Sequence, residues 1–277
     1  MWRLGFASVF AIALACLSGT RAGAANPLWG DDATPVALLP LVDYSEFGAS
    51  DSLILSVLET ELADRGIAFR SPDELRPVLR AHRIRSQGSL SQNEAEILAR
   101  ESGVGRALFT VVCGYAVDRA PEFALSLRVV DLRTMDVEGA AVASAVGDDF
   151  AGWFGVGRKE ESAALVAPIV RKALAELERS PSHHLDLPRL LVVPFDDVGE
   201  HPRAGEVVTE AAFAELFAAG WPVVEPGLAR DLFLRRHVVP RGGVDAPTLQ
   251  ALRDSLGVEL VLTGEVQTFR SAQSSAE

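Results

Sequence analysis

Few residues of this chain have the types and spacing that catalysis or ligand binding requires. The sequence has no phosphate-binding Gly-x-x-x-x-Gly-Lys-Ser/Thr, no dinucleotide-binding Gly-x-Gly-x-x-Gly after a strand, no Gly-x-Ser-x-Gly nucleophile turn and no His-Glu-x-x-His zinc motif. Adjacent histidines, His183 and His184, point in different directions in any regular element, so a shared metal would need a loop and a third ligand. We therefore expect no catalytic, cofactor or metal site, and no enzymatic activity.

Two aspartates recur directly after short apolar stretches that read as buried strands. Asp43 follows Val36–Val42, and Asp197 follows a matching stretch that begins at Leu190. One interpretation is a ligand contact at the carboxyl end of a strand, where open α/β sheets bind ligands. The other, which we favour, is a carboxylate that caps its own loop by accepting hydrogen bonds from nearby backbone N–H groups.

The first residues of the chain read as an export signal. Arg3 precedes an apolar stretch over residues 4–17, and Ala22-Gly23-Ala24 has the small-x-small form of a signal-peptidase site. We expect residues 1–25 to be a signal peptide, and the mature protein to be periplasmic or extracellular.

A cysteine inside the same segment allows an alternative. Ile12-Ala13-Leu14-Ala15-Cys16 is a permissive lipobox, with small Ala15 directly before Cys16. Lipidation of Cys16 would tether the chain to a membrane as an outer-membrane lipoprotein. Cys113, in a β-branched run, is expected to be a buried small hydrophobe.

An aromatic cluster stands out between the expected sheet and the helix expected over 158–179. Phe150, Trp153 and Phe154 lie among glycines. Aromatic side chains anchor interfaces, so one interpretation is a loop that contacts a partner. The alternative is that these rings cap the core of their own unit against that helix.

The secondary-structure elements that position these residues recur in the sequence at a constant spacing. Pro40 and Pro194 are separated by 154 residues, and the same shift without a gap aligns further glycines, prolines, glutamates and leucines, among them Glu61 with Glu215, Gly66 with Gly220, Pro72 with Pro226, Leu98 with Leu252, and Gly103 with Gly257. We infer two tandem repeats from this pattern.

The repeated unit reads as β-α-β-α-α-β-β-β. Ser71-Pro72 is a good helix start, Ser91 and Glu94 form a capping box, and Gly103 ends the helix that follows. Strands are expected near 36–42, 67–69 and 104–112. A half-exposed strand over 123–130 is expected to pair with 137–146 as a hairpin. The fold class is therefore α/β, a mixed β-sheet with helices packed on it.

The boundaries follow from the offset. We expect a first α/β module over 26–180, a linker over 181–187 and a second module over 188–277. The second module follows the first up to Phe269, and no equivalent of the hairpin precedes Glu277. We expect it to be C-terminally incomplete, with the chain a fragment. Alternatively, a partner strand or a second copy covers the open sheet edge.

Composition limits the partners. The 277 residues carry 26 Lys+Arg against 38 Asp+Glu, a formal charge of −12, which argues against gripping a phosphate backbone. Aromatic residues make up 7%, too few for a platform that stacks single-stranded bases. We expect no nucleic acid partner.

Two stretches of the second repeat resemble known envelope proteins. Val192-Val193-Pro194-Phe195 and Gly257–Val266 are similar to the N-terminal domain of the Tol-system protein TolB and to the periplasmic domain of the CsgG-like curli secretion lipoproteins. The resemblance implies an α/β module used for protein contacts in the cell envelope, and it brings no catalytic motif.

The expected function follows from the export signal and from the resemblance to envelope proteins. We expect an exported, non-enzymatic envelope protein that binds another envelope protein or a second copy of itself. The alternative is an outer-membrane lipoprotein of a CsgG-like secretion or assembly system.

Overall fold

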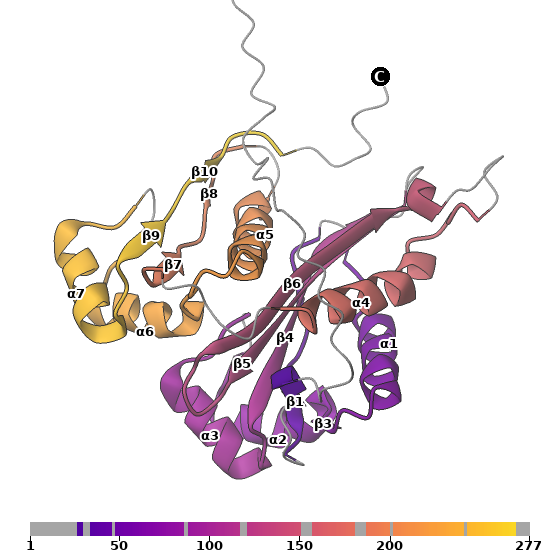
Figure 1. Cartoon of the computed structure of the whole chain (residues 1–277), viewed down its shortest axis with the longest axis horizontal. Helices are drawn as coiled ribbons and strands as arrows, with labels where there is room; N and C mark the ends of the chain where they lie inside the picture. The colour runs from indigo at the N-terminus through magenta and orange to yellow at the C-terminus, as the bar shows by residue number, and fades with distance from the viewer. Residues whose placement is uncertain are drawn as a thin grey trace, which may run out of the picture.

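A computed structural model gives the arrangement of the chain (Figure 1). It describes residues 27–29, 34–45, 48–85, 88–116, 121–150, 157–180, 187–199, 202–240 and 243–269. We call residues 27–180 the N-terminal half and residues 187–269 the C-terminal half. The mixed α/β class expected from the sequence is confirmed.

The N-terminal half contains the expected order of elements. Its elements are the short 3-10 helix η1 (Pro27–Trp29), β1 (Val36–Leu38), β2 (Val42–Asp43), α1 (Asp51–Asp64), β3 (Phe69–Arg70), α2 (Pro72–Ala81), α3 (Gln92–Ser102), β4 (Arg106–Ala116), β5 (Glu122–Asp131), β6 (Val137–Val146), the 3-10 helix η2 (Gly147–Phe150) and α4 (Ala163–Leu177). The single strand expected over 36–42 is instead two short strands, because Pro40 between them has no N–H to donate.

These strands form one mixed sheet in the order β3-β1-β4-β5-β6, with β2 beside β4. Strands β1, β2 and β3 run parallel to their neighbours, while β5 is antiparallel to both β4 and β6. The helix starts are as expected, since Ser71 and Ser91 each form a complete capping box with a glutamate three residues later.

The C-terminal half has the elements β7 (Leu190–Val192), β8 (Asp196–Asp197), α5 (Ala204–Ala218), α6 (Pro226–Arg236), α7 (Ala246–Leu256), β9 (Leu260–Leu262) and β10 (Glu265–Val266). Helices α2 and α6 both begin at a proline, and α3 and α7 both end at a glycine with φ of 65°. Among the described residues, β7 pairs with β9 and β8 with β10. The recurrence of element order fits the 154-residue offset, and the duplication itself stays a prediction.

Helices cover both faces of the large sheet (Figure 1). Helices α1 and α4 pack on one face, where α4 contributes the last element expected for the first unit. The opposite face is covered by α2 and α3 and, over β5 and β6, by α5 from the C-terminal half. Helix α5 also contacts β7, β8 and β10 of its own half, so it lies between the large sheet and these short strands.

This arrangement corrects the expectation of a half-exposed strand over 123–130. Every residue from Leu125 to Val130 is buried, including the polar Ser126 and Arg128. The face that alternation assigned to solvent is covered by Phe213, Ala214 and Phe217 of α5.

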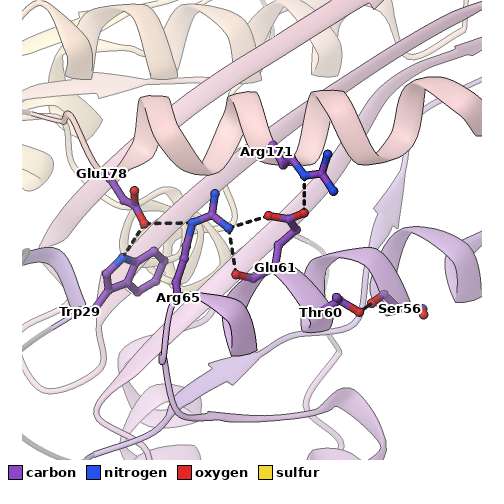
Figure 2. Close-up of polar contacts among 7 residues, drawn as sticks. All are labelled: Trp29, Ser56, Thr60, Glu61, Arg65, Arg171 and Glu178. Carbon is purple, nitrogen blue, oxygen red and sulfur yellow. Dashed lines mark hydrogen bonds and ion pairs between the residues drawn. The ribbon is translucent and has the colours of Figure 1, made fainter.

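An ionic network joins α1 to α4 at the edge of the core (Figure 2). Glu61 accepts from Arg65 at 2.7 Å and from Arg171 at 2.5 Å, and Arg65 also pairs with Glu178 at 3.3 Å. Trp29 Nε1 donates to Glu178 at 3.4 Å, which ties η1 to the same site. Burial raises the pKa of Glu61, but the two arginines outweigh it and hold that pKa below its usual value.

Candidate interaction site between the two halves

A buried arginine lies at the centre of the contact between the halves. Arg128 on β5 is 2% exposed, and its guanidinium carbon lies 4.9 Å from the ring centres of Phe109 on β4 and Phe213 on α5. Its Nε pairs with Glu225 Oε2 at 3.0 Å, and its Nη1 pairs with Glu210 Oε2 at 3.4 Å. The planar cation thus stacks on one aromatic ring from each half while meeting two carboxylates of the C-terminal half.

The backbone completes this cluster. Arg128 donates a further hydrogen bond to the carbonyl of Gly88, and Glu210 Oε2 accepts from the Ser126 hydroxyl at 3.2 Å. Glu225 is the N-cap of α6 and accepts from the backbone N–H of Gly227 at 3.4 Å. We call Arg128, Glu210, Glu225, Phe109 and Phe213 the Arg128 cluster.

Burial and charge set the ionisation of the cluster. Burial alone would lower the pKa of Arg128, but Glu225 and Glu210 together raise it, so the guanidinium stays charged. Burial raises the pKa of Glu225, and the attraction of Arg128 only partly opposes that. One cation faces two carboxylates here, so the charges do not cancel when both acids are ionised.

Helix α6 is pressed against the N-terminal half at its first turns. A Cβ placed on Gly227 would lie 1.8 Å from the carbonyl oxygen of Leu90, so only glycine permits this approach. One turn later, Arg230 donates to the Ser89 hydroxyl at 3.2 Å and to Glu94 Oε2 at 3.1 Å. Arg230 therefore binds the N-terminal half.

A cleft of about 390 Å³ lies beside the cluster, at the boundary of the two halves. Its walls are mostly apolar, from β7 and the residues after it and from α6, with polar groups from α5 and from the N-terminal half. Its lining residues are Tyr44, Gly88, Ser89, Leu191, Val192, Val193, Pro194, Glu206, Thr209, Glu210, Pro226, Ala229, Arg230, Phe233, Leu234, Val238, Val239 and Pro240.

Two apolar side chains of this lining face solvent. Leu234 is 65% exposed and Val239 is 71% exposed. At the offset of 154, the same positions of the N-terminal half hold Arg80 and Arg85, which are also exposed. Since the corresponding solvent positions hold arginine in one half and leucine and valine in the other, the exposed apolar pair is particular to the mouth of this cleft.

One end of the cleft is polar. Glu206 and Glu210 approach from α5, and Tyr44 approaches from the residues after β2. Burial, with the negative charges of Glu210 and Glu206, raises the pKa of Tyr44 to about 12, so its hydroxyl stays protonated. Arg203 lies 5.7 Å from the Tyr44 ring and donates to the carbonyl of Asp43 at 3.0 Å.

The two aspartates singled out in the sequence both bind their own loops. Asp43 Oδ1 accepts from the N–H of Ser45 at 2.7 Å and from its hydroxyl at 2.6 Å, while Oδ2 accepts from the N–H of Ala49 at 2.6 Å. Asp197 Oδ1 accepts from the N–H of Gly205 at the start of α5. These are the hydrogen bonds of loop-capping carboxylates, and a ligand role for either stays a prediction.

The other singled-out residues are only partly described. Phe150 packs against the core beneath α1 and α4, whereas Trp153, Phe154 and Cys16 lie outside the described residues. Cys113 is buried, and burial raises the pKa of its thiol. Over the part of the chain that the structure describes, no three histidine, cysteine or acidic side chains gather as a metal site, and no helix is long and apolar enough to cross a membrane.

Sequence reasoning missed the residues that build this site. Arg128 stands between apolar residues, Leu127 and Val129, in the middle of a strand, which indicates a paired buried charge, but nothing in the local sequence identifies Glu225 as its partner. Leu234 and Val239 are visible as apolar replacements of Arg80 and Arg85 once the two halves are aligned.

Comparisons with known proteins identify no family. No protein-family model and no curated protein sequence matches the chain. Solved structures that match include a PelC dodecamer from Paraburkholderia phytofirmans, with 18% identity, a TM-score of 0.36, and coverage of 52% of this chain and 86% of that one. The lipoprotein GNA1162 from Neisseria meningitidis matches with 14% identity, a TM-score of 0.38, and coverage of 53% and 99%.

A third match concerns the resemblance seen in the sequence. TolB from Acinetobacter baumannii matches with 14% identity and a TM-score of 0.25, over 52% of this chain and 29% of that one. TM-scores and identities this low assign no function, so the relation to TolB and to CsgG-like proteins stays a prediction.

Proposed function

We propose that this chain is an exported, non-enzymatic protein of the cell envelope that binds another envelope protein through the cleft between its halves. The observation that carries the proposal is the exposed apolar pair at the mouth of the cleft. Leu234 and Val239 face solvent, and the positions 154 residues earlier, in the N-terminal half, hold Arg80 and Arg85. An apolar rim around a preformed hollow is what a protein-docking surface requires.

The export signal at the start of the chain supports the envelope part of the proposal. Arg3, the apolar residues 4–17 and the small residues Ala22 to Ala24 have the pattern of an export signal. The sequence supports the non-enzymatic part, because it carries none of the phosphate-binding, dinucleotide-binding, nucleophile or zinc motifs named above.

Photo-crosslinking in intact cells tests the proposal. p-Benzoylphenylalanine is placed at Leu234 or at Val239 in the full chain, and the matched controls carry it at Arg80 or Arg85. We expect a discrete protein adduct from the cleft positions and none from the controls. Equal labelling at all four positions, or no protein adduct at any, would contradict a docking site at the cleft.

A second candidate rests on the Ile12–Cys16 lipobox. A lipidated Cys16 would make the chain an outer-membrane lipoprotein, the form expected of a CsgG-like secretion or assembly system. Mass spectrometry of the mature N-terminus separates the two. A diacylated Cys16 supports the lipoprotein, and an N-terminus at Ala25 or Asn26 removes it.

A further inference from the structure

The charge left unsatisfied in the cleft says what kind of segment can bind there. Each cation near it is already engaged: Arg128 by Glu225 and Glu210, Arg230 by Ser89 and Glu94, and Arg203 by the carbonyl of Asp43. Among the carboxylates of the lining, that of Glu206 makes no hydrogen bond or ion pair with any described residue, and that of Glu210 uses only Oε2.

The hydroxyl of Tyr44 is also available. It lies in the same polar end of the cleft and makes no hydrogen bond with a described residue. At this hydroxyl, the negative charges of Glu206 and Glu210 together outweigh the positive charge of Arg128. The polar end of the cleft therefore attracts a cation, and the net charge of −12 on the chain extends the attraction to longer range.

The apolar part of the cleft sets the size and shape of the rest of the ligand. Leu191, Val193, Ala229 and Phe233 line it, and its volume of about 390 Å³ lies at the low end of the roughly 300–1,000 Å³ found for ligand pockets. That space suits one or two bulky side chains.

We infer that the cleft binds a segment of a partner protein that inserts a bulky apolar side chain between β7 and α6 and places a lysine or arginine beside it, against Glu206 and Glu210. This inference rests on the proposed function and specifies the chemistry of the partner. The apolar anchor supplies most of the binding energy, and the cation supplies orientation and discrimination against acidic partners.

A second copy of this chain is a poorer occupant. Two copies would each bring a net charge of −12, so their approach is opposed by long-range repulsion. A fatty acid is disfavoured for the same reason, because its carboxylate would meet Glu206 and Glu210. Dimerisation of the chain remains an outcome that the experiment can return.

Two dye-labelled peptides with one apolar core test the inference. Lys-Leu-Phe-Leu-Lys and Glu-Leu-Phe-Leu-Glu are titrated with the full chain at low ionic strength, and binding is read by fluorescence anisotropy. We expect the lysine peptide to bind at least tenfold more tightly, and we expect added salt to reduce the difference. Equal affinities, no binding, or preference for the glutamate peptide would overturn the inference.

Variants assign the effect to residues. The double variant Leu234→Arg/Val239→Arg installs the residues of the N-terminal half at exposed positions and should abolish binding of both peptides. Glu206→Gln should reduce the preference for lysine severalfold and leave the apolar contribution intact. Glu215→Gln, an exposed carboxylate on the same helix and outside the cleft, is the matched control and should change nothing.

Failure of the inference is distinguishable from failure of the proposed function. A protein adduct at Val239 without a lysine preference keeps the docking function and removes the basic partner. A lysine preference without any adduct in cells keeps the recognition chemistry and removes the docking function. Concentration-dependent dimers in sedimentation velocity that block peptide binding would make a second copy the occupant.

Discussion

Arg128 has three kinds of partner at once: the aromatic rings of Phe109 and Phe213, two carboxylates and a backbone carbonyl. A charge held this way is stable only while all partners remain. At the residue scale, Arg128 of β5 is therefore one of the side chains that hold the two halves together, alongside Arg230 and Arg203.

Removing that side chain should be costly. We expect Arg128→Ala to lower the free energy of unfolding by about 3–5 kcal/mol, because Glu225 stays buried without its counter-charge. Urea denaturation measures the loss. The double variant Arg128→Met/Glu225→Gln, which removes both charges at similar volume, should recover much of it. Arg80→Ala, an exposed arginine, is the control, and a loss of similar size there would argue against a special role for Arg128.

The cluster also predicts an unusual dependence on pH. The raised pKa of Glu225 means that the folded state holds a proton at a pH where the unfolded chain has lost it. Stability therefore falls as pH rises from the ordinary carboxyl pKa of about 4.3 through the folded pKa. Glu61 acts in the opposite sense, because its lowered pKa gives stability that is lost as pH falls below the ordinary value.

Glu225→Gln isolates this contribution. The unfolding free energy of wild type and variant is measured across that pH range. We expect the wild type to lose stability relative to the variant as pH rises, since glutamine does not ionise. Curves that stay parallel throughout would show that Glu225 has the same pKa in both states.

At the scale of elements, α6 is positioned by contact rather than by its own preference. Gly227 stands in its first turn because the carbonyl of Leu90 occupies the place of a side chain. We expect Gly227→Ala to destabilise the protein by about 2 kcal/mol or more, although alanine is the better helix former. Arg236→Ala on the exposed face is the control. If Gly227→Ala were stabilising in thermal unfolding, the close approach would be disproved.

The elements also show which features could be predicted from the sequence. Capping at Ser71 and Ser91 and the stop at Gly103 depend on residues within one turn, so local chemistry predicts them. The burial of β5 does not depend on nearby residues, because the helix that covers it is α5. Glu210, the α5 partner of Arg128, lies 82 residues further along the chain. Alternation of apolar and polar residues describes only the faces that a strand offers, and tertiary contact decides which of them is covered.

The same reason explains the incomplete prediction of the site. Asp43 and Asp197 stand out in the sequence because they follow strands, yet both bind their own loops. A single leucine or valine gives no sign of a binding site in the sequence. Leu234 and Val239 therefore stand out only when they are compared with Arg80 and Arg85. The offset supplies that comparison, but only the structure shows that both line one cleft.

At the scale of the whole molecule, helix α5 packs on strands of both halves. Because α5 packs on the large sheet and on the short strands of its own half, we expect one cooperative unfolding transition rather than two. Cys113 is a convenient probe, since its buried thiol with a raised pKa should react with thiol reagents only after unfolding.

The measurement compares labelling of Cys113 with circular dichroism in urea, in a Cys16→Ser background. We expect the two curves to coincide in the wild type. In Arg128→Ala we expect them to separate, because the halves then open independently. Coincident curves in the variant would show that the cluster does not couple the halves.

The shared helix also sets an order of events in the life of the chain. A polypeptide that emerges from its amino end completes β5 and β6 long before Ala218 finishes α5. Until then, the outer face of the hairpin is bare, and Arg128 lacks Glu210 and Glu225. A nascent or truncated product that ends near Ser180 would present that apolar face to chaperones and proteases, so release of the C-terminal half is the step that protects the N-terminal half from degradation.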